Sequence, residues 1–205
     1  MADQQKAQPK QASKVENSAA DKDARALNAA VAALNRGETI AYPTEAVWGL
    51  GCDPDNPRAL ERLLTLKQRD PAKGMILIAG DIDQLDPWLA GITPSQRETL
   101  LASWPGPHTW LVPDNGRAHP LLRGEHSQVA LRLSDHPLVA RLCRAFRGPI
   151  VSTSANLAGT LPARSSEEVR AAFGQRVAVI LEGELGRYPR PSTIHELTTG
   201  RILRP

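Results

Sequence analysis

The sequence lacks several features that would place it in a familiar class of protein. Aromatic residues make up only 4% of its 205 residues, and cysteine occurs twice. No apolar run approaches the roughly 20 residues needed to span a bilayer, and the first residues contain no apolar core of a signal peptide. We therefore expect a soluble, cytoplasmic protein in which Cys52 and Cys143 are reduced, partly buried side chains.

Recognised metal and phosphate motifs are also missing. The cysteines fit no metal-ligand spacing, and the five histidines, at positions 108, 119, 126, 136 and 195, form no HExxH-like pattern, so we expect no dedicated protein metal site. There is no GxxxxGK[ST] loop, and Gly49-Leu50-Gly51 lacks the third glycine of the dinucleotide motif. A nucleotide would therefore need an atypical phosphate site.

Composition divides the chain near residue 23. Residues 1–23 contain Val15 as the only branched apolar residue, so we expect a disordered tail there and one folded domain over 24–205. Beyond the tail nearly every cation is an arginine, and the two exceptions, Lys67 and Lys73, share one short segment. Lysine offers a compact point charge where arginine offers a planar fork, so this choice suggests a phosphate contact.

Hydrophobic periodicity predicts helices that alternate with short strands. Amphipathic helices are expected at 23–35, 57–68, 82–89, 94–103, 136–146 and 167–173, with Ser165 or Ser166 capping the last one. Strands are expected at 40–42, 75–79, 109–112, 129–133, 149–151, 177–181 and 201–203, and a loop at 114–127. This order predicts an α/β domain around a twisted, mostly mixed β-sheet flanked by helices.

The stretch from Thr39 to Asp53 holds the first candidate site. An apolar run ends at Pro43, which cannot continue a strand ladder, and Thr44 and Glu45 follow before the glycines of 49–51. A strand that ends in polar side chains and tight backbone is typical of a binding surface at the edge of an α/β sheet. An ordinary strand and turn is the alternative.

Other predicted elements end in polar or cationic side chains in the same way. They are Lys67, Arg69, Arg132, Ser152, Ser154, Asn156, Ser192 and Arg204. Each alone is most simply a turn former or a solvated cation. Together they indicate a concave basic groove with hydroxyl donors, which suits a polyanion, with nucleotide phosphate as the leading candidate, and a small polar partner.

Six separated motifs occur in order along the chain. They are AYPTE with GLG (41–51), KQR with KG (67–74), WPGP (104–107), VALR followed by DHP (129–137), STSAN (152–156), and PSTI before LRP (191–205). From about residue 25 to 205 the chain thereby resembles the YrdC-like family, in particular its threonylcarbamoyl-adenylate synthases. One departure is Asp70, which separates Arg69 from the proline that usually follows it in the family.

The resemblance implies that L-threonine, bicarbonate and ATP are converted to threonylcarbamoyl-adenylate and pyrophosphate, for modification of tRNA by a downstream threonylcarbamoyl-transfer complex. It assigns Lys67, Arg69, Ser154, Asn156 and Arg204 to ATP, with Lys67 and Arg69 as catalytic residues, and Thr44, Arg132, Ser152 and Ser192 to threonine. Mg²⁺ is expected to arrive with ATP. We further expect Lys67 to be an exposed lysine at a helix end, important for rate and not for stability.

Two alternatives belong to other classes. The arginine content suggests weakly a binder of tRNA or double-stranded RNA, although the low aromatic content and the lack of a known RNA module disfavour it. A carbamoyltransferase or hydrogenase-maturation protein of the same superfamily would need additional segments that do not fit this length.

Overall fold

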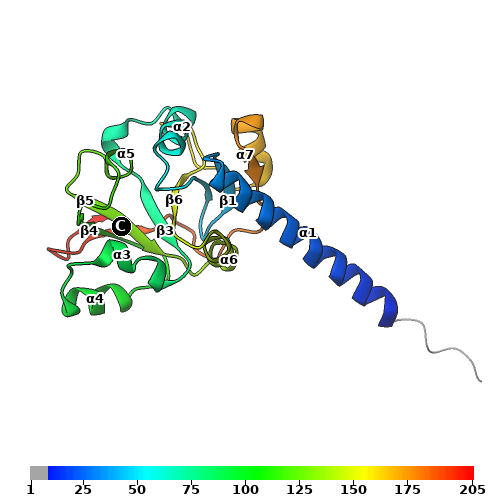
Figure 1. The fold of residues 1–205 in the computed structure, drawn as a ribbon, viewed down its shortest axis with the longest axis horizontal. Helices are drawn as coiled ribbons and strands as arrows, with labels where there is room; N and C mark the ends of the chain where they lie inside the picture. Colours follow the sequence, from blue (N-terminus) through cyan, green and yellow to red (C-terminus); the bar gives the residue numbers. More distant parts are fainter. Residues whose placement is uncertain (1–8) are drawn as a thin grey trace, which may run out of the picture.

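The computed structural model describes residues 9–205, with side chains from residue 21 onward. Within this part, nine strands form one sheet in the order β7-β1-β2-β6-β3-β5-β4-β8-β9. They are β1 (Ile40–Pro43), β2 (Trp48–Gly51), β3 (Ile76–Ala79), β4 (His108–Pro113), β5 (Gln128–Leu133), β6 (Ile150–Ser154), β7 (Val179–Ile180), β8 (Thr193–Glu196) and β9 (Ile202–Arg204). Figure 1 labels strands β1, β3, β4, β5 and β6, and the helices around them. The pairs β1–β7, β3–β5 and β4–β8 are parallel and the others antiparallel, which confirms the predicted mixed sheet.

Apart from α1 and α5, the helices lie where the periodicity predicts them. They are α1 (Pro9–Asn35), α2 (Pro57–Lys67), α3 (Asp86–Leu89), α4 (Pro94–Leu101), α5 (Pro120–Arg123), α6 (Pro137–Phe146) and α7 (Ser166–Phe173), with 3-10 turns η1 (Pro71–Lys73), η2 (Ile82–Gln84) and η3 (Gly174–Arg176). Ser165 caps α7 by accepting a hydrogen bond from the Glu168 N–H, so it is the cap of the two candidates. No helix in residues 9–205 is long and apolar enough to cross a bilayer.

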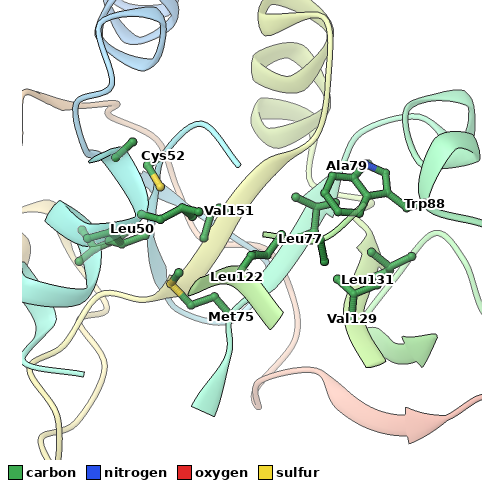
Figure 2. Close-up of a cluster of buried hydrophobic side chains, with 14 of the residues drawn as sticks. Leu50, Cys52, Met75, Leu77, Ala79, Trp88, Leu122, Val129, Leu131 and Val151 are labelled. Atoms are coloured by element: carbon green, nitrogen blue, oxygen red, sulfur yellow. The ribbon is translucent and has the colours of Figure 1, made fainter. Parts of the chain in front are cut away.

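The sheet separates two hydrophobic clusters. Ile40, Tyr42 and Ile78 pack with α1 and α6 on one face, whereas Leu50, Leu77 and Leu131 belong to a larger cluster with α2 and α3 (Figure 2). Because side chains alternate along a strand, neighbouring residues of β3 serve different clusters. The cluster that a strand residue joins therefore shows which face of the sheet its side chain is on, and polar residues of neighbouring strands that share a face can line one site.

Both cysteines are free and fully buried, Cys52 in the larger cluster and Cys143 in the smaller one. Burial raises the pKa of both thiols, that of Cys143 to about 12. The prediction of buried cysteines is confirmed, and the burial is deeper than expected.

The sequence interpretation differs from the structure around the glycines of the first candidate stretch. Trp48 to Gly51 form β2, an antiparallel partner of β1, and not a turn. The glycines allow close packing, since a Cβ on Gly51 would lie 2.6 Å from the Val151 carbonyl oxygen and 2.9 Å from the Tyr42 ring. The predicted 114–127 loop likewise contains the short helix α5.

Helix α1 is longer than predicted. It continues back from Asp23 to Pro9, through residues for which the composition indicates no regular structure. Alanine and lysine, with three residues each, are the most frequent residues there, and both have high helix propensity. Residues 1–8 of the predicted tail lie outside the described residues, and the division into a tail and one domain stays a prediction. In Figure 1 the N-terminal part of α1 extends away from the sheet.

Deleting residues 1–22 should leave the melting temperature and the rate of pyrophosphate release unchanged. The contacts of α1 with the smaller cluster begin at Ala26 and Leu27 and continue through Leu34, all of which the deletion retains. Thermal melts and pyrophosphate assays of the truncated and full chains test this expectation. A loss of rate on truncation would show that the N-terminal residues contribute to the site.

Candidate active site

A cavity of about 420 Å³ lies on the face of the sheet that also carries the smaller cluster. Ile76 and Ile78 are two residues apart on β3 and therefore point to the same face. Ile78 packs with α6, whereas Ile76 lines the cavity. In the neighbouring strands Ile76 is paired with Ala130 and Ser152, which also line it. The cavity therefore lies beside α6, over the middle strands of the sheet.

The structure brings most of the predicted site residues to this one cavity. Those that line it are Thr44, Arg69, Arg132, Ser152, Ser154, Ser192 and Arg204. They come from widely separated parts of the chain, and five lie on strands or directly before one: Arg132 on β5, Ser152 and Ser154 on β6, Ser192 before β8, and Arg204 on β9. The two other predicted residues, Lys67 and Asn156, do not line the cavity.

The lining is strongly basic. It contains Arg69, Lys73, Arg123, Arg132 and Arg204, and no carboxylate among the described residues. Arg123 is paired with Asp114 and Arg132 with Glu45, but Arg69, Lys73 and Arg204 form no ion pair with any described residue. Positive charge without a protein counter-ion in a partly enclosed space attracts ligands with several negative charges.

Two of these arginines are fixed by main-chain oxygens. Arg69 donates from Nε and Nη2 to the Gly74 carbonyl at 3.1 and 2.7 Å, and Arg204 donates from the same atoms to the Ser192 carbonyl at 3.1 and 2.6 Å. Burial lowers the pKa of both guanidinium groups, and for Arg204 the charge of Arg132 adds to this effect. Both side chains thus present their remaining N–H groups in a defined direction.

Lys67 is buried, so its expected exposure is wrong. Its side chain is only 3% exposed, and Nζ donates to the carbonyl oxygens of Ser154 and, at 2.8 Å, of Asn156. Burial lowers its pKa to about 8, and the nearby charge of Arg69 contributes. A helix end usually leaves lysine in water, but here α2 ends against the turn that follows β6.

That turn is held by side chains of its own. Ser154 Oγ donates to Asn156 Oδ1 at 2.6 Å, and Asn156 Nδ2 donates to the carbonyl oxygens of Leu157 and Thr160 at 2.9 and 2.8 Å. Asn156 is therefore placed behind Ser154 and orders the loop that leads to Pro162, another lining residue.

The predicted threonine-side hydroxyls are buried and partly engaged. Thr44 Oγ1 donates to the Val47 carbonyl at 2.7 Å, which closes the turn between β1 and β2. Ser192 Oγ lies 2.7 Å from Thr109 Oγ1, with either atom as donor. Ser152 lies on β6, next to Ile76 in register. Ser192 Oγ also accepts a hydrogen bond from Arg204 Nη2 at 3.3 Å, so this hydroxyl lies directly beside a cation of the lining.

Arg132 is buried as well, and it is not an unpaired arginine. Its Nη2 lies 2.7 Å from Oε2 of Glu45, and its Nε donates to the Gly106 carbonyl at 3.2 Å. The side chain still lines the cavity, so its other N–H groups are available to a ligand.

Sequence reasoning missed part of the lining. Lys73 was noted beside Lys67 but not assigned to the site, and Arg123 and His126 lie in the stretch that was interpreted as an unpatterned loop. For Lys73 the signal was present, because it lies in the same short segment as Arg69. For Arg123 only the fold, which packs α5 beside η1, shows its position.

Comparison with protein families gives a match over most of the chain. The family model named Sua5/YciO/YrdC, described as "Telomere recombination", matches residues 32–205. A threonylcarbamoyl-AMP synthase of Chromohalobacter salexigens is 68% identical over 175 residues, which cover 85% of this chain and 94% of the relative. A threonylcarbamoyl-AMP synthase of Stenotrophomonas maltophilia is 51% identical over 180 residues, with 87% and 97% covered.

Solved structures show the same fold. P. abyssi Sua5 complexed with L-threonine has a TM-score of 0.82 and 27% identity, with 87% of this chain and 53% of that chain covered. E. coli YciO has a TM-score of 0.77 and 25% identity, and 88% of each chain is covered. The predicted resemblance is thus confirmed by sequence and by fold.

Proposed function

Because the chain belongs to the Sua5/YciO/YrdC family, we infer that it is a threonylcarbamoyl-AMP synthase. It converts L-threonine, bicarbonate and ATP to L-threonylcarbamoyl-AMP and pyrophosphate, for threonylcarbamoyladenosine modification of tRNA. The observation that carries this conclusion is the 68% identity to a threonylcarbamoyl-AMP synthase, over 94% of that relative's length. The enzyme is a nucleotidyltransferase.

The chemistry fits a basic cavity without a nucleophilic side chain. The threonine amine and bicarbonate form a carbamate with loss of water, and a carbamate oxygen attacks the α-phosphorus of ATP. The bond between the α- and β-phosphates breaks, and pyrophosphate leaves. The protein has to hold several anions together and to offset the charge that develops on the transferring group. The unpaired cations of the lining, Arg69, Lys73 and Arg204, are suited to this task.

We propose that the ATP phosphates lie against Arg69, Ser154 and Arg204, with Lys73 as a further contact. Lys67 and Asn156 support this arrangement by fixing the turn that carries Ser154, as their hydrogen bonds indicate. Of the two residues assigned as catalytic, Arg69 lines the cavity, whereas Lys67 acts indirectly by fixing the turn that carries Ser154.

We propose that threonine lies at the other part of the lining, near Thr44, Ser152 and Ser192. Its carboxylate pairs with Arg132, whose planar guanidinium matches a carboxylate in shape and charge. The buried hydroxyls are suited to the polar groups of a small amino acid.

Mg²⁺ is expected to be held by the phosphates of ATP. The lining contains no carboxylate, and the described residues contain no cluster of three or more His, Cys, Asp or Glu side chains that could hold a metal. Mg²⁺ commonly binds through substrate phosphates and water in enzymes that use ATP, where it offsets phosphate charge. Cytoplasmic location, transfer of the product to a tRNA-modifying complex and weak binding of RNA are further expectations.

Incubating the protein with ATP, L-threonine and bicarbonate should yield pyrophosphate and the adenylate in the complete absence of RNA. Any RNA binding by the basic surface should weaken steeply with salt and show little sequence preference, because it would rest on phosphate contacts. Product that forms only when tRNA is added would contradict the proposed function.

A further inference from the structure

The carboxylate of Glu45 is buried beside the cavity and does not line it. It is 2% exposed and belongs to the turn between β1 and β2. Oε2 forms the ion pair with Arg132, and Oε1 accepts hydrogen bonds from Ser134 Oγ at 2.7 Å and from the Asp135 N–H at 3.2 Å. We call Glu45, Arg132, Ser134 and Asp135 the Glu45 cluster.

Burying a carboxylate is costly unless charge and hydrogen bonds compensate it. The Glu45 cluster supplies one cation and two donors from the segment that joins β5 to α6. A carboxylate held by so many groups has little freedom, so it also restricts the groups that it contacts. Arg132 is therefore held at Nη2 by the charge of Glu45 and at Nε by a hydrogen bond to the Gly106 carbonyl.

From this geometry we propose that Glu45 is a positioning residue, which holds the Arg132 guanidinium in the orientation that receives the carboxylate of threonine. The inference rests on the proposed function and extends it by one residue. A long arginine side chain loses conformational freedom when it binds a ligand. An arginine that is already fixed before the ligand arrives binds it with a smaller entropic cost.

The main chain of the same turn also binds the segment around residues 186–188 by hydrogen bonds. The Gly186 N–H donates to the Thr44 carbonyl at 3.0 Å, and the Tyr188 N–H donates to the Glu45 carbonyl at 3.3 Å. A Cβ on Gly186 would lie 2.7 Å from the Glu45 Cα, so the two segments pack closely. This segment leads on to Ser192. Because these contacts use backbone atoms, a change of the Glu45 side chain tests the contact to Arg132 separately.

Glu45→Gln should raise the KM for threonine about tenfold or more, because the amide cannot form the ion pair that fixes the guanidinium. The KM for ATP should stay within about twofold, since Arg69 and Arg204 do not contact Glu45. The preference of the enzyme for L-threonine over L-threoninamide should fall in parallel. A merely structural role would not change this preference, because only the carboxylate distinguishes the two substrates.

Two further variants complete the experiment. Ser134→Ala removes one hydrogen-bond donor to Glu45 Oε1 and keeps the ion pair with Arg132, so a smaller rise in the threonine KM is expected. This variant also provides the test if Glu45→Gln does not fold. Glu38→Gln is the matched control, because Glu38 Oε2 also lies 2.7 Å from an arginine, Arg36, but outside the cavity. It should change neither KM.

The outcomes separate the positioning role from the proposed function. If the unchanged protein forms no adenylate, the proposed function is wrong. If it does, and Glu45→Gln and Ser134→Ala retain the threonine KM and the preference over threoninamide, the positioning role alone is overturned. Equal rises of both KM values would also overturn it.

Discussion

Lys67→Ala should lower the maximal rate by roughly a hundredfold or more, because it releases the turn that holds Ser154 beside the cavity, and a small misplacement of a positioning group can cost that much. It should also lower the melting temperature. The ammonium donates to the carbonyl oxygens of Ser154 and Asn156 in a site where it is 3% exposed. Leaving buried acceptors without a donor costs about 1–3 kcal/mol each, although water entering the space left by the side chain would reduce this.

Two variants sharpen the interpretation of this result. Lys67→Arg should recover little, because a planar fork cannot replace a compact ammonium between main-chain oxygens. Lys73→Ala is the matched variant for stability, because Lys73 is exposed on η1 and should not affect the melting temperature when removed. Steady-state rates and thermal melts of all three variants decide the matter. A normal rate in Lys67→Ala with a lowered melting temperature would restrict Lys67 to folding.

The expected effect on stability could not be obtained from the sequence. The pattern of α2 predicts its end correctly, but a lysine at a helix end is normally solvated. The pairing of β2 with β6 brings the turn after β6 within reach of Lys67. Burial of this side chain is therefore a property of the tertiary fold, which local periodicity does not contain.

The secondary structure was largely predictable because its signals are local. Apolar spacing indicates α2 and α6, and continuous apolar runs indicate the buried strands β3 and β5. The glycines of β2 were misinterpreted because glycine is more typical of turns. The close approach to Tyr42 and the Val151 carbonyl, which requires them, involves residues far away in the sequence.

The sequence motifs predicted most of the residues that line the cavity, but they did not predict which residues these side chains contact. Polar residues at element ends indicated most of the lining, because strand ends converge at one region of a sheet. Nothing in the sequence indicated that Arg132 contacts Glu45 or that Ser192 contacts Thr109. These pairs lie 87 and 83 positions apart in the chain, and only the strand order brings them together.

Arg132→Ala should raise the KM for threonine about tenfold to a hundredfold, as expected for a lost charge-assisted contact worth roughly 1.5–3 kcal/mol. The KM for ATP should change much less, because Arg132 forms no hydrogen bond or ion pair with Arg69, Ser154 or Arg204 and affects Arg204 only through its charge. Arg97→Ala is the matched control. Arg97 forms an exposed ion pair with Asp86 at the same 2.7 Å and does not line the cavity, so both KM values should stay normal.

The same variant should be less stable, and this effect has to be separated from binding. Removing Arg132 leaves the buried carboxylate of Glu45 without its cation, which typically costs about 3–5 kcal/mol. The double variant Arg132→Met/Glu45→Gln removes both charges and should recover much of that stability. It should not recover threonine binding, because the guanidinium is still missing. Recovery of the threonine KM together with stability would assign Arg132 to the fold, and equal rises for threonine and ATP in Arg132→Ala would do the same.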